Sequence, residues 1–236
     1  MSTNKKFDIP SVPFAFEGVY ASLILAIADA SHGRIEMALA DGADINRKIL
    51  KSFTPLAFAA RLGNDDIVRF LLDKGANVNS DGGMALVYAV EKGHCDIVKT
   101  LLEAGADIET REEYDLTCLI KASWQNNLEL IKILLDAGAD INAQSRNGTT
   151  ALMTAAARGH EDVVKYLVEA KADVNVKDEK GLTALTLAAK NGYINIVKYL
   201  VETCADSLTA LANAKNKGLN DIVKYLISPA PIPEAD

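Results

Sequence analysis

The sequence predicts an all-α fold: a solenoid of stacked helix-turn-helix units with projecting β-hairpin loops. One observation is a glycine that recurs at Gly63, Gly93, Gly159 and Gly192, with Asn126 taking the position between the second and third, in steps of 30, 33, 33 and 33 residues. A second marker keeps the same period, and helical apolar patterns lie between the markers. Self-similarity at this period indicates a repeat architecture in which neighbouring units bury one another's apolar faces.

The second marker is a Gly-Ala-Asp or Gly-Ala-Asn group. Its steps are 33, 30, 33, 33 and 33 residues, and the same unit absorbs the three-residue deletion in both series. Lys171 and Cys204 take the glycine position in the last two copies. Because they lack the freedom of glycine at positive φ, each is expected to cost its unit about 1 kcal/mol. The full series is Gly42, Gly75, Gly105, Gly138, Lys171 and Cys204.

Each unit contains two predicted helices, of which the second is the more regular. It carries apolar residues at positions i, i+1, i+4 and i+5, with Lys or Arg at i+2, as in Ile67, Val68, Leu71 and Leu72 around Arg69. On a helix this spacing gathers the apolar side chains into one stripe and leaves the cation in water. The stripe predicts which face of each second helix is buried.

The first helix of each unit is shorter and in most units follows a threonine. Threonine can cap the first turn of a helix, and Pro55 occupies a position where a missing N–H does no harm. Alanine pairs such as Ala59–Ala60 leave room for a neighbouring helix to approach. The predicted starts of these inner helices are near Thr54, Met84, Thr117, Thr150 and Thr183.

The repeats predict a single domain, residues 18–228, between an extended leader, 1–17, and a C-terminal tail, 229–236. The divergent units at the two ends are interpreted as caps, because a terminal unit has one face without a neighbour. Phe14 and Phe16 of the leader are expected to dock on the first unit. The alternative is that this segment is a peptide that another protein binds. The predicted units span approximately 18–46, 47–79, 80–109, 110–142, 143–175, 176–206 and 207–228.

This pattern resembles the ankyrin repeat. The resemblance rests on T-P-L-x-x-A-A from Thr54, on Gly-His at Gly93 and Gly159, on I-V-x-x-L-L and on G-A-D-I-N. It covers roughly Gly18 to Ile227, and several motifs stay in register over many copies. The resemblance implies that the concave side, formed by the hairpins and the inner helices, binds partner proteins.

The residues that could carry chemistry have structural explanations. The resemblance implies that His94 and His160, which share a repeat position, bond to the turn backbone. The carboxylate pairs Asp65–Asp66 and Glu161–Asp162 lie in turns or at a helix start, where solvation or the helix dipole explains them better than acid–base catalysis. The sequence contains no phosphate loop, nucleophile elbow or metal-ligand spacing. We therefore expect no enzyme, and no catalytic, cofactor-binding or metal-binding residue.

The composition bears on compartment and partners. The formal net charge is −7, and an acidic surface repels phosphate backbones. The three cysteines, Cys95, Cys118 and Cys204, have neither disulfide-framework nor zinc spacing, which suits a reducing compartment. The most apolar run, 19–28, is too short to span a bilayer. We expect a cytoplasmic monomer that binds neither nucleic acid nor membranes, with export as an effector left open.

Information about a partner must lie at positions that packing leaves free, which are the hairpin tips and the two positions after each alanine pair. Trp124 is the single tryptophan, at a position where other units carry Arg, Glu, Ala or Lys. An aromatic beside a charged rim is typical of a binding hot spot. The alternatives are that Trp124 folds over a gap at Asn126 and that Tyr88 is inner-face packing. The candidate partner-binding residues are Trp124, Tyr114, Leu116, Tyr88, Phe53, Arg47, Lys48, Arg61 and Arg158.

Together these features predict a non-catalytic module that binds a partner protein through its concave face. Two alternatives stay open, since a fold alone does not fix a function. One is an inhibitor, antitoxin-like or host-directed effector protein that blocks or retargets an enzyme. The other is a regulatory subunit of an enzyme whose site forms only with a partner.

Overall fold

The structure, a computed structural model, describes residues 18–49, 53–203 and 208–227. The predicted leader and tail lie outside the described residues, as do Leu50, Lys51 and Cys204. The described part contains α-helices and one short 3-10 helix, but no strand. In chain order these are α1 (Val19–Ala28), α2 (His32–Ala40), α3 (Pro55–Leu62), α4 (Asp65–Asp73), α5 (Ser80–Lys92), α6 (Cys95–Glu103), η1 (Glu113–Asp115), α7 (Cys118–Trp124), α8 (Leu128–Asp136), α9 (Ala151–Arg158), α10 (Glu161–Glu169), α11 (Ala184–Asn191), α12 (Ile194–Glu202), α13 (Leu208–Asn216) and α14 (Asn220–Ile227).

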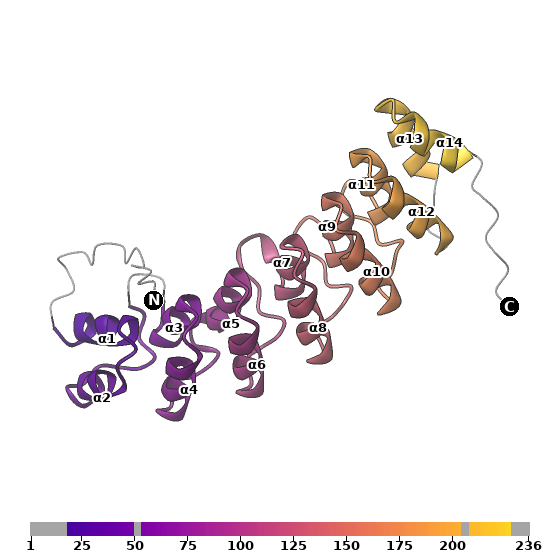
Figure 1. Cartoon of the computed structure of the whole chain (residues 1–236). Helices are drawn as coiled ribbons and strands as arrows, with labels where there is room; N and C mark the ends of the chain where they lie inside the picture. The colour runs from indigo at the N-terminus through magenta and orange to yellow at the C-terminus, as the bar shows by residue number, and fades with distance from the viewer. Residues whose placement is uncertain (1–17, 50–52, 204–207, 228–236) are drawn as a thin grey trace, which may run out of the picture. The chain divides into compact units, whose positions relative to one another are not determined.

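The chain divides into two compact units, Met1–Ala106 (unit 1) and Asp107–Asp236 (unit 2). Within unit 1, the inner helices α1, α3 and α5 pack side by side, and each packs against its own outer helix, α2, α4 or α6 (Figure 1). Unit 2 repeats this arrangement with α7, α9, α11 and α13 as inner helices and α8, α10, α12 and α14 as outer helices. The all-α repeat fold is therefore confirmed, whereas the single domain and the boundaries of its units stay predictions.

The threonines do cap the inner helices. Thr54 Oγ1 accepts a hydrogen bond from Ala57 N at 3.2 Å, and Thr117, Thr150 and Thr183 make the same bond at 3.3, 3.2 and 3.3 Å. Each bond satisfies one of the N–H groups that a first helical turn leaves without a partner. All four threonines are buried, so their hydroxyl groups depend on this bond.

The third inner helix of unit 1 begins differently. Helix α5 extends back to Ser80, but Asp81, Gly82 and Gly83 have left-handed φ of 62°, 69° and 77°, so regular helix resumes only at the predicted start, Met84. The shortened loop is therefore a tight left-handed turn rather than a hairpin. The other projecting loops also lack strands in the described part of the chain, where two isolated antiparallel bridges occur, Ile49–Phe53 and Arg111–Thr117.

The outer helices bury the predicted stripe. In α4, Ile67, Val68 and Leu71 are fully buried, Leu72 is half-buried and Arg69 is exposed. The equivalent residues of α6, α8, α10 and α12 behave alike, except that Lys165 of α10 is half-buried. Two positions that lack the expected glycine keep its backbone conformation, since Asn126 has φ 58° and Lys171 has φ 71°. The predicted cost of Lys171 follows from this geometry.

The Gly-Ala-Asp-x-Asn segments link consecutive loops, in an arrangement that we call the loop ladder. Within one loop, Asp140 Oδ1 accepts from Asn142 N at 2.9 Å, which is an Asx turn. The Asn142 side-chain oxygen then accepts from Asp173 N of the next loop at 2.9 Å. The same link joins Asn46 to Asn77 N in unit 1 at 2.8 Å. The motif thus stabilises both a turn and its neighbour.

Candidate functional site

Three of the predicted binding residues, Tyr114, Leu116 and Trp124, line a cavity of about 360 Å³ in unit 2. We call it the tryptophan pocket. It lies between the loop that contains η1, the loop before α9, and the inner helices α7 and α9. Its lining consists of Glu112, Tyr114, Leu116, Ile120, Lys121, Trp124, Ser145, Asn147, Thr149 and Thr154.

Trp124 forms one wall of the tryptophan pocket. It is the last residue of α7, and 55% of its surface is exposed, so the side chain is not folded into a core gap. The guanidinium carbon of Arg158, at the end of α9, lies 4.0 Å from the centre of its ring. His160 Nε2 lies 3.3 Å from the carbonyl oxygen of Trp124; since a carbonyl oxygen can only accept, the imidazole donates. The helix end that presents the indole is therefore held by the next repeat.

Tyr114 stands on the opposite loop in a strained backbone. Its φ is 65°, a left-handed value that a residue with a Cβ rarely adopts, and 59% of its surface is exposed. Its counterparts in the next two loops, Asn147 and Lys180, do not take positive φ. The strained turn is held by a hydrogen bond from Arg146 N to Tyr114 O at 3.0 Å, and the Arg146 guanidinium lies 5.9 Å from the tyrosine ring.

Sequence reasoning missed the ion pair inside the tryptophan pocket. Lys121 is paired with Glu112, and both side chains are mostly buried, at 17% and 20% exposed. A signal for Lys121 was present, because the same position of the other inner helices carries Phe58, Tyr88, Thr154 or Leu187. A charged residue among apolar and hydroxyl counterparts marks a departure from the packing pattern. Leu116, which was predicted, is half-buried in the lining.

Three other predicted residues, Phe53, Arg61 and Tyr88, meet in unit 1 together with Phe58, and we call these four residues the phenylalanine cluster. The ring centres of Phe53 and Tyr88 are 4.8 Å apart, and those of Phe53 and Phe58 are 6.3 Å apart. The Arg61 guanidinium lies 5.2 Å above the Phe53 ring. Phe53 and Tyr88 are half-buried, so they pack against each other as well as facing outward.

Arg47 and Lys48 are engaged elsewhere in unit 1. The Arg47 guanidinium lies 4.8 Å above the ring of Tyr20, and Lys48 is paired with Asp81, whose side chain is 7% exposed. The Lys48 pair joins the first loop to the left-handed turn before Met84. These two residues are therefore separate from the phenylalanine cluster, although Arg47 itself is exposed.

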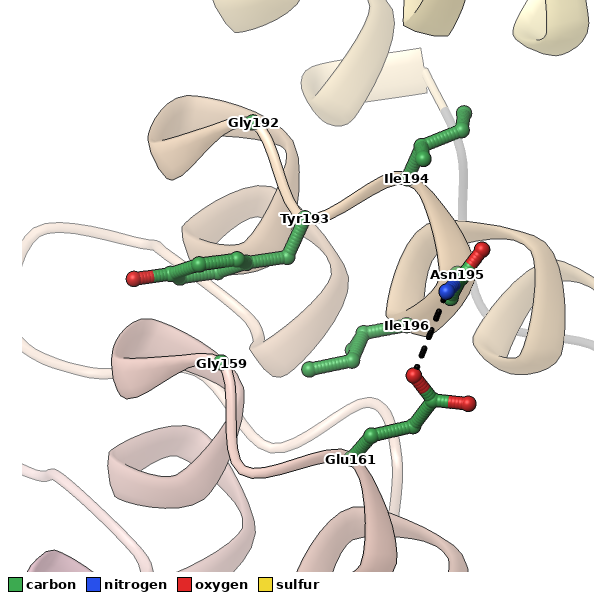
Figure 2. Close-up of a pocket in the computed structure, with 7 residues that line it drawn as sticks. All are labelled: Gly159, Glu161, Gly192, Tyr193, Ile194, Asn195 and Ile196. Atoms are coloured by element: carbon green, nitrogen blue, oxygen red, sulfur yellow. Dashed lines mark hydrogen bonds between the residues drawn. The ribbon is translucent and has the colours of Figure 1, made fainter.

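Figure 2 shows a second, smaller hollow of about 230 Å³ in unit 2, next to the turns that precede α10 and α12. The ring of Tyr193 extends over Gly159, where an added Cβ would lie 2.5 Å from Tyr193 Cε1. Glu161 accepts hydrogen bonds from Lys165 at 2.8 Å and from Asn195 at 3.3 Å. These bonds, with that of Lys165 the stronger cause, lower the pKa of Glu161. The polar groups here are engaged in packing one repeat against the next.

The described residues show little reactive chemistry. Burial raises the pKa of the Cys118 thiol to about 12, so this cysteine is not a thiolate at neutral pH. No group of three or more His, Cys, Asp or Glu side chains in the described part of the chain could hold a metal ion. None of the described helices combines the length and the apolar character that a bilayer crossing requires.

Comparison with known families agrees with the repeat geometry. A family model described as ankyrin repeats, in three copies, matches residues 23–112, 119–207 and 171–235. The chain therefore belongs to the ankyrin-repeat family, whose repeats generally serve as protein–protein interaction modules and are typically non-catalytic. No curated protein matches the chain significantly.

Proposed function

We propose that this ankyrin-repeat protein binds a partner protein through unit 2, with the tryptophan pocket at the centre of the contact. The observation that carries the proposal is the exposed Trp124 side chain, which forms one wall of the tryptophan pocket. Large, rigid aromatic side chains beside arginines dominate the energy of many protein interfaces. Among the other aromatic side chains of the described residues, Tyr114 alone is as exposed as Trp124, and it lines the same pocket.

Backbone strain at Tyr114 also supports the tryptophan pocket as the partner-binding site. Left-handed backbone at a non-glycine residue costs free energy, and such residues cluster at functional sites because selection maintains them there. At Tyr114 the strain positions an exposed ring on the rim of the tryptophan pocket. A role in packing alone would not need an exposed tyrosine in this conformation.

The candidates in unit 1 are proposed as a second contact area. Phe53, Tyr88 and Arg61 form a half-buried aromatic cluster with a cation on its face. Arg47 and Lys48 belong to the first loop, where Arg47 is exposed.

The experiment compares three forms of the protein as bait in a lysate of the native source. Trp124→Ala should lose captured proteins that the wild type retains, because it removes one wall of the tryptophan pocket. Met37→Ala is the matched control, since Met37 is 67% exposed on α2 and lies outside both contact areas. All three should melt within about 2 °C of one another, as expected for exposed positions. A Trp124→Ala bait that captures the same proteins as Met37→Ala would refute the proposal.

A further inference from the structure

One positive charge at the tryptophan pocket is unmatched. Lys121 is paired with Glu112, and Arg146 Nε lies 3.2 Å from Asp115 Oδ2. Arg158 is exposed and, among the described residues, contacts the Trp124 ring but no carboxylate. Among the side chains that the structure describes, the pocket and its rim therefore present one guanidinium more than their carboxylates neutralise, in a chain whose formal net charge is −7.

The Arg158 guanidinium is also oriented. At 4.0 Å from the centre of the indole it is stacked on a rigid, wide ring. A stacked guanidinium keeps its N–H donors free at the edge, in a planar fork that matches a carboxylate. Holding the fork in place before binding reduces the side-chain entropy that the interaction would otherwise lose.

The pocket itself offers mainly an apolar surface. Two of the lining hydroxyl groups already have partners, since Thr154 Oγ1 donates to Thr150 O at 2.9 Å and Ser145 Oγ accepts from Thr149 N at 3.2 Å. The remaining lining includes Leu116, Ile120 and the indole of Trp124. Its volume of about 360 Å³ is at the small end of the range for ligand sites, about 300–1,000 Å³, which suits a large side chain rather than a folded element.

The hollow of Figure 2 and the phenylalanine cluster give weaker support for a ligand site. In the hollow of Figure 2, Glu161 is satisfied by Lys165 and Asn195, and the Tyr193 ring packs over Gly159. The phenylalanine cluster has its own cation, since the Arg61 guanidinium lies over the Phe53 ring, and its aromatic rings pack against one another. The tryptophan pocket combines a cavity, apolar walls and an oriented charge without a carboxylate partner among the described residues.

We propose that the tryptophan pocket takes one large apolar side chain from an extended segment of the partner, and that Arg158 pairs with an Asp or Glu side chain close to it in that segment. The inference rests on the proposed function and adds the chemistry of the occupant. A carboxylate fits better than a phosphate group, because anionic phosphate sites use clusters of arginines whereas a single guanidinium matches a single negative charge.

The test begins with selection from a displayed library of random 12-residue peptides. Wild-type protein should enrich peptides in which a large apolar residue lies within three positions of Asp or Glu. Selection on Arg158→Gln should keep the apolar residue and lose the acidic preference. Selection on Trp124→Ala should enrich neither. Arg158 is exposed, so Arg158→Gln should retain the wild-type melting temperature.

The second step measures the coupling with one selected peptide and its Asp→Asn or Glu→Gln counterpart. Trp124 is the single tryptophan of the chain, so its fluorescence reports binding at the tryptophan pocket directly. For the wild type, losing the carboxylate should weaken binding about tenfold, as for a charge-assisted hydrogen bond. For Arg158→Gln, the two peptides should bind within about twofold of each other.

The outcomes separate the two proposals. If wild-type protein enriches apolar peptides that depend on Trp124 without an acidic residue, the role of Arg158 is wrong and the proposed function stands. The same conclusion follows if both protein forms lose equal affinity when the carboxylate is removed. If no peptide depends on Trp124, the proposed function itself fails for the tryptophan pocket.

Discussion

Tyr114 and its neighbours show how single residues set the character of the candidate site. Where the next two loops have Gly148 and Gly181 at the left-handed position, this loop has Asp115, with φ 56°. Tyr114 precedes it and is left-handed as well. Two consecutive non-glycine residues in this region cost about 1–2 kcal/mol each, less for Asp because its short side chain tolerates the conformation. The left-handed backbone therefore lowers the stability of a loop that exposes an aromatic ring at the tryptophan pocket.

Tyr114→Asn tests this trade-off, because asparagine tolerates left-handed φ and is the residue at the equivalent position 147. The strain relieved is about 1–2 kcal/mol, whereas the cation–π interaction between the ring and Arg146 contributes about 0.5–1 kcal/mol at an exposed site. The free energy of unfolding in urea should therefore stay equal or rise. Binding of the partner or of selected peptides should weaken. Lower stability with unchanged binding would mean that the ring is structural.

At this scale the sequence predicted three of the ten residues that line the tryptophan pocket, Tyr114, Leu116 and Trp124, but not how their side chains pair. Trp124, Tyr114, Leu116 and Arg158 were identified because they occupy positions that packing leaves free, and they do lie at or beside one cavity. The stacking of Arg158 on Trp124 depends on side-chain direction between two repeats, which periodicity does not contain. Tyr114 was chosen as an aromatic at a loop tip, whereas its strain is a property of backbone angles alone.

At the scale of elements, the repeat motif explains both the turn and the stacking. In the loop ladder a single residue makes two hydrogen bonds. The backbone N–H of Asn142 closes the Asx turn, and its side-chain oxygen accepts a hydrogen bond from Asp173 N of the following loop. Glu109 makes the equivalent link to Asp140 N at 2.9 Å with a carboxylate oxygen. What the position requires is therefore an acceptor of suitable reach rather than an amide.

The requirement for an acceptor predicts different effects for two substitutions of Asn142. Asn142→Ala leaves Asp173 N without its partner and should lower the free energy of unfolding by about 1 kcal/mol. Asn142→Asp keeps an acceptor oxygen and should cost clearly less. Urea denaturation followed by circular dichroism measures both. Equal losses for the two variants would show that the amide nitrogen, or the size of the side chain, matters instead.

Helix boundaries were predicted best where a local signal fixes them. Thr54, Thr117, Thr150 and Thr183 each precede an inner helix and cap it, because an N-cap is an interaction within one turn. The start of α5 lacks a threonine, and the sequence there predicted a short hairpin. Three left-handed residues from Asp81 replace it, and the burial of Asp81 beside Lys48 could not be predicted without knowing how two loops meet.

At the scale of the whole molecule, the sequence predicted the architecture because the same pattern is repeated many times. Each copy alone is weak evidence, but two markers and an apolar stripe in register exclude most other folds. Contacts within each unit run between helices of one pair or of adjacent pairs, as expected for a repeat architecture. The identity of the partner has no such redundancy, because the exposed positions differ from one repeat to the next.

If the free energy of unfolding is a sum over the repeats and the contacts between neighbouring repeats, a destabilising substitution should affect mainly its own repeat and the adjacent ones. In unit 2, Leu200→Ala in α12 removes a fully buried side chain and should cost about 2–5 kcal/mol. Helix α12 contacts α10, α11 and α14, so hydrogen exchange should accelerate most in α11–α14 and least in α7 and α8. Leu134→Ala in α8 should give the reverse pattern. Equal acceleration throughout unit 2 for both variants would mean that its repeats unfold as one cooperative body.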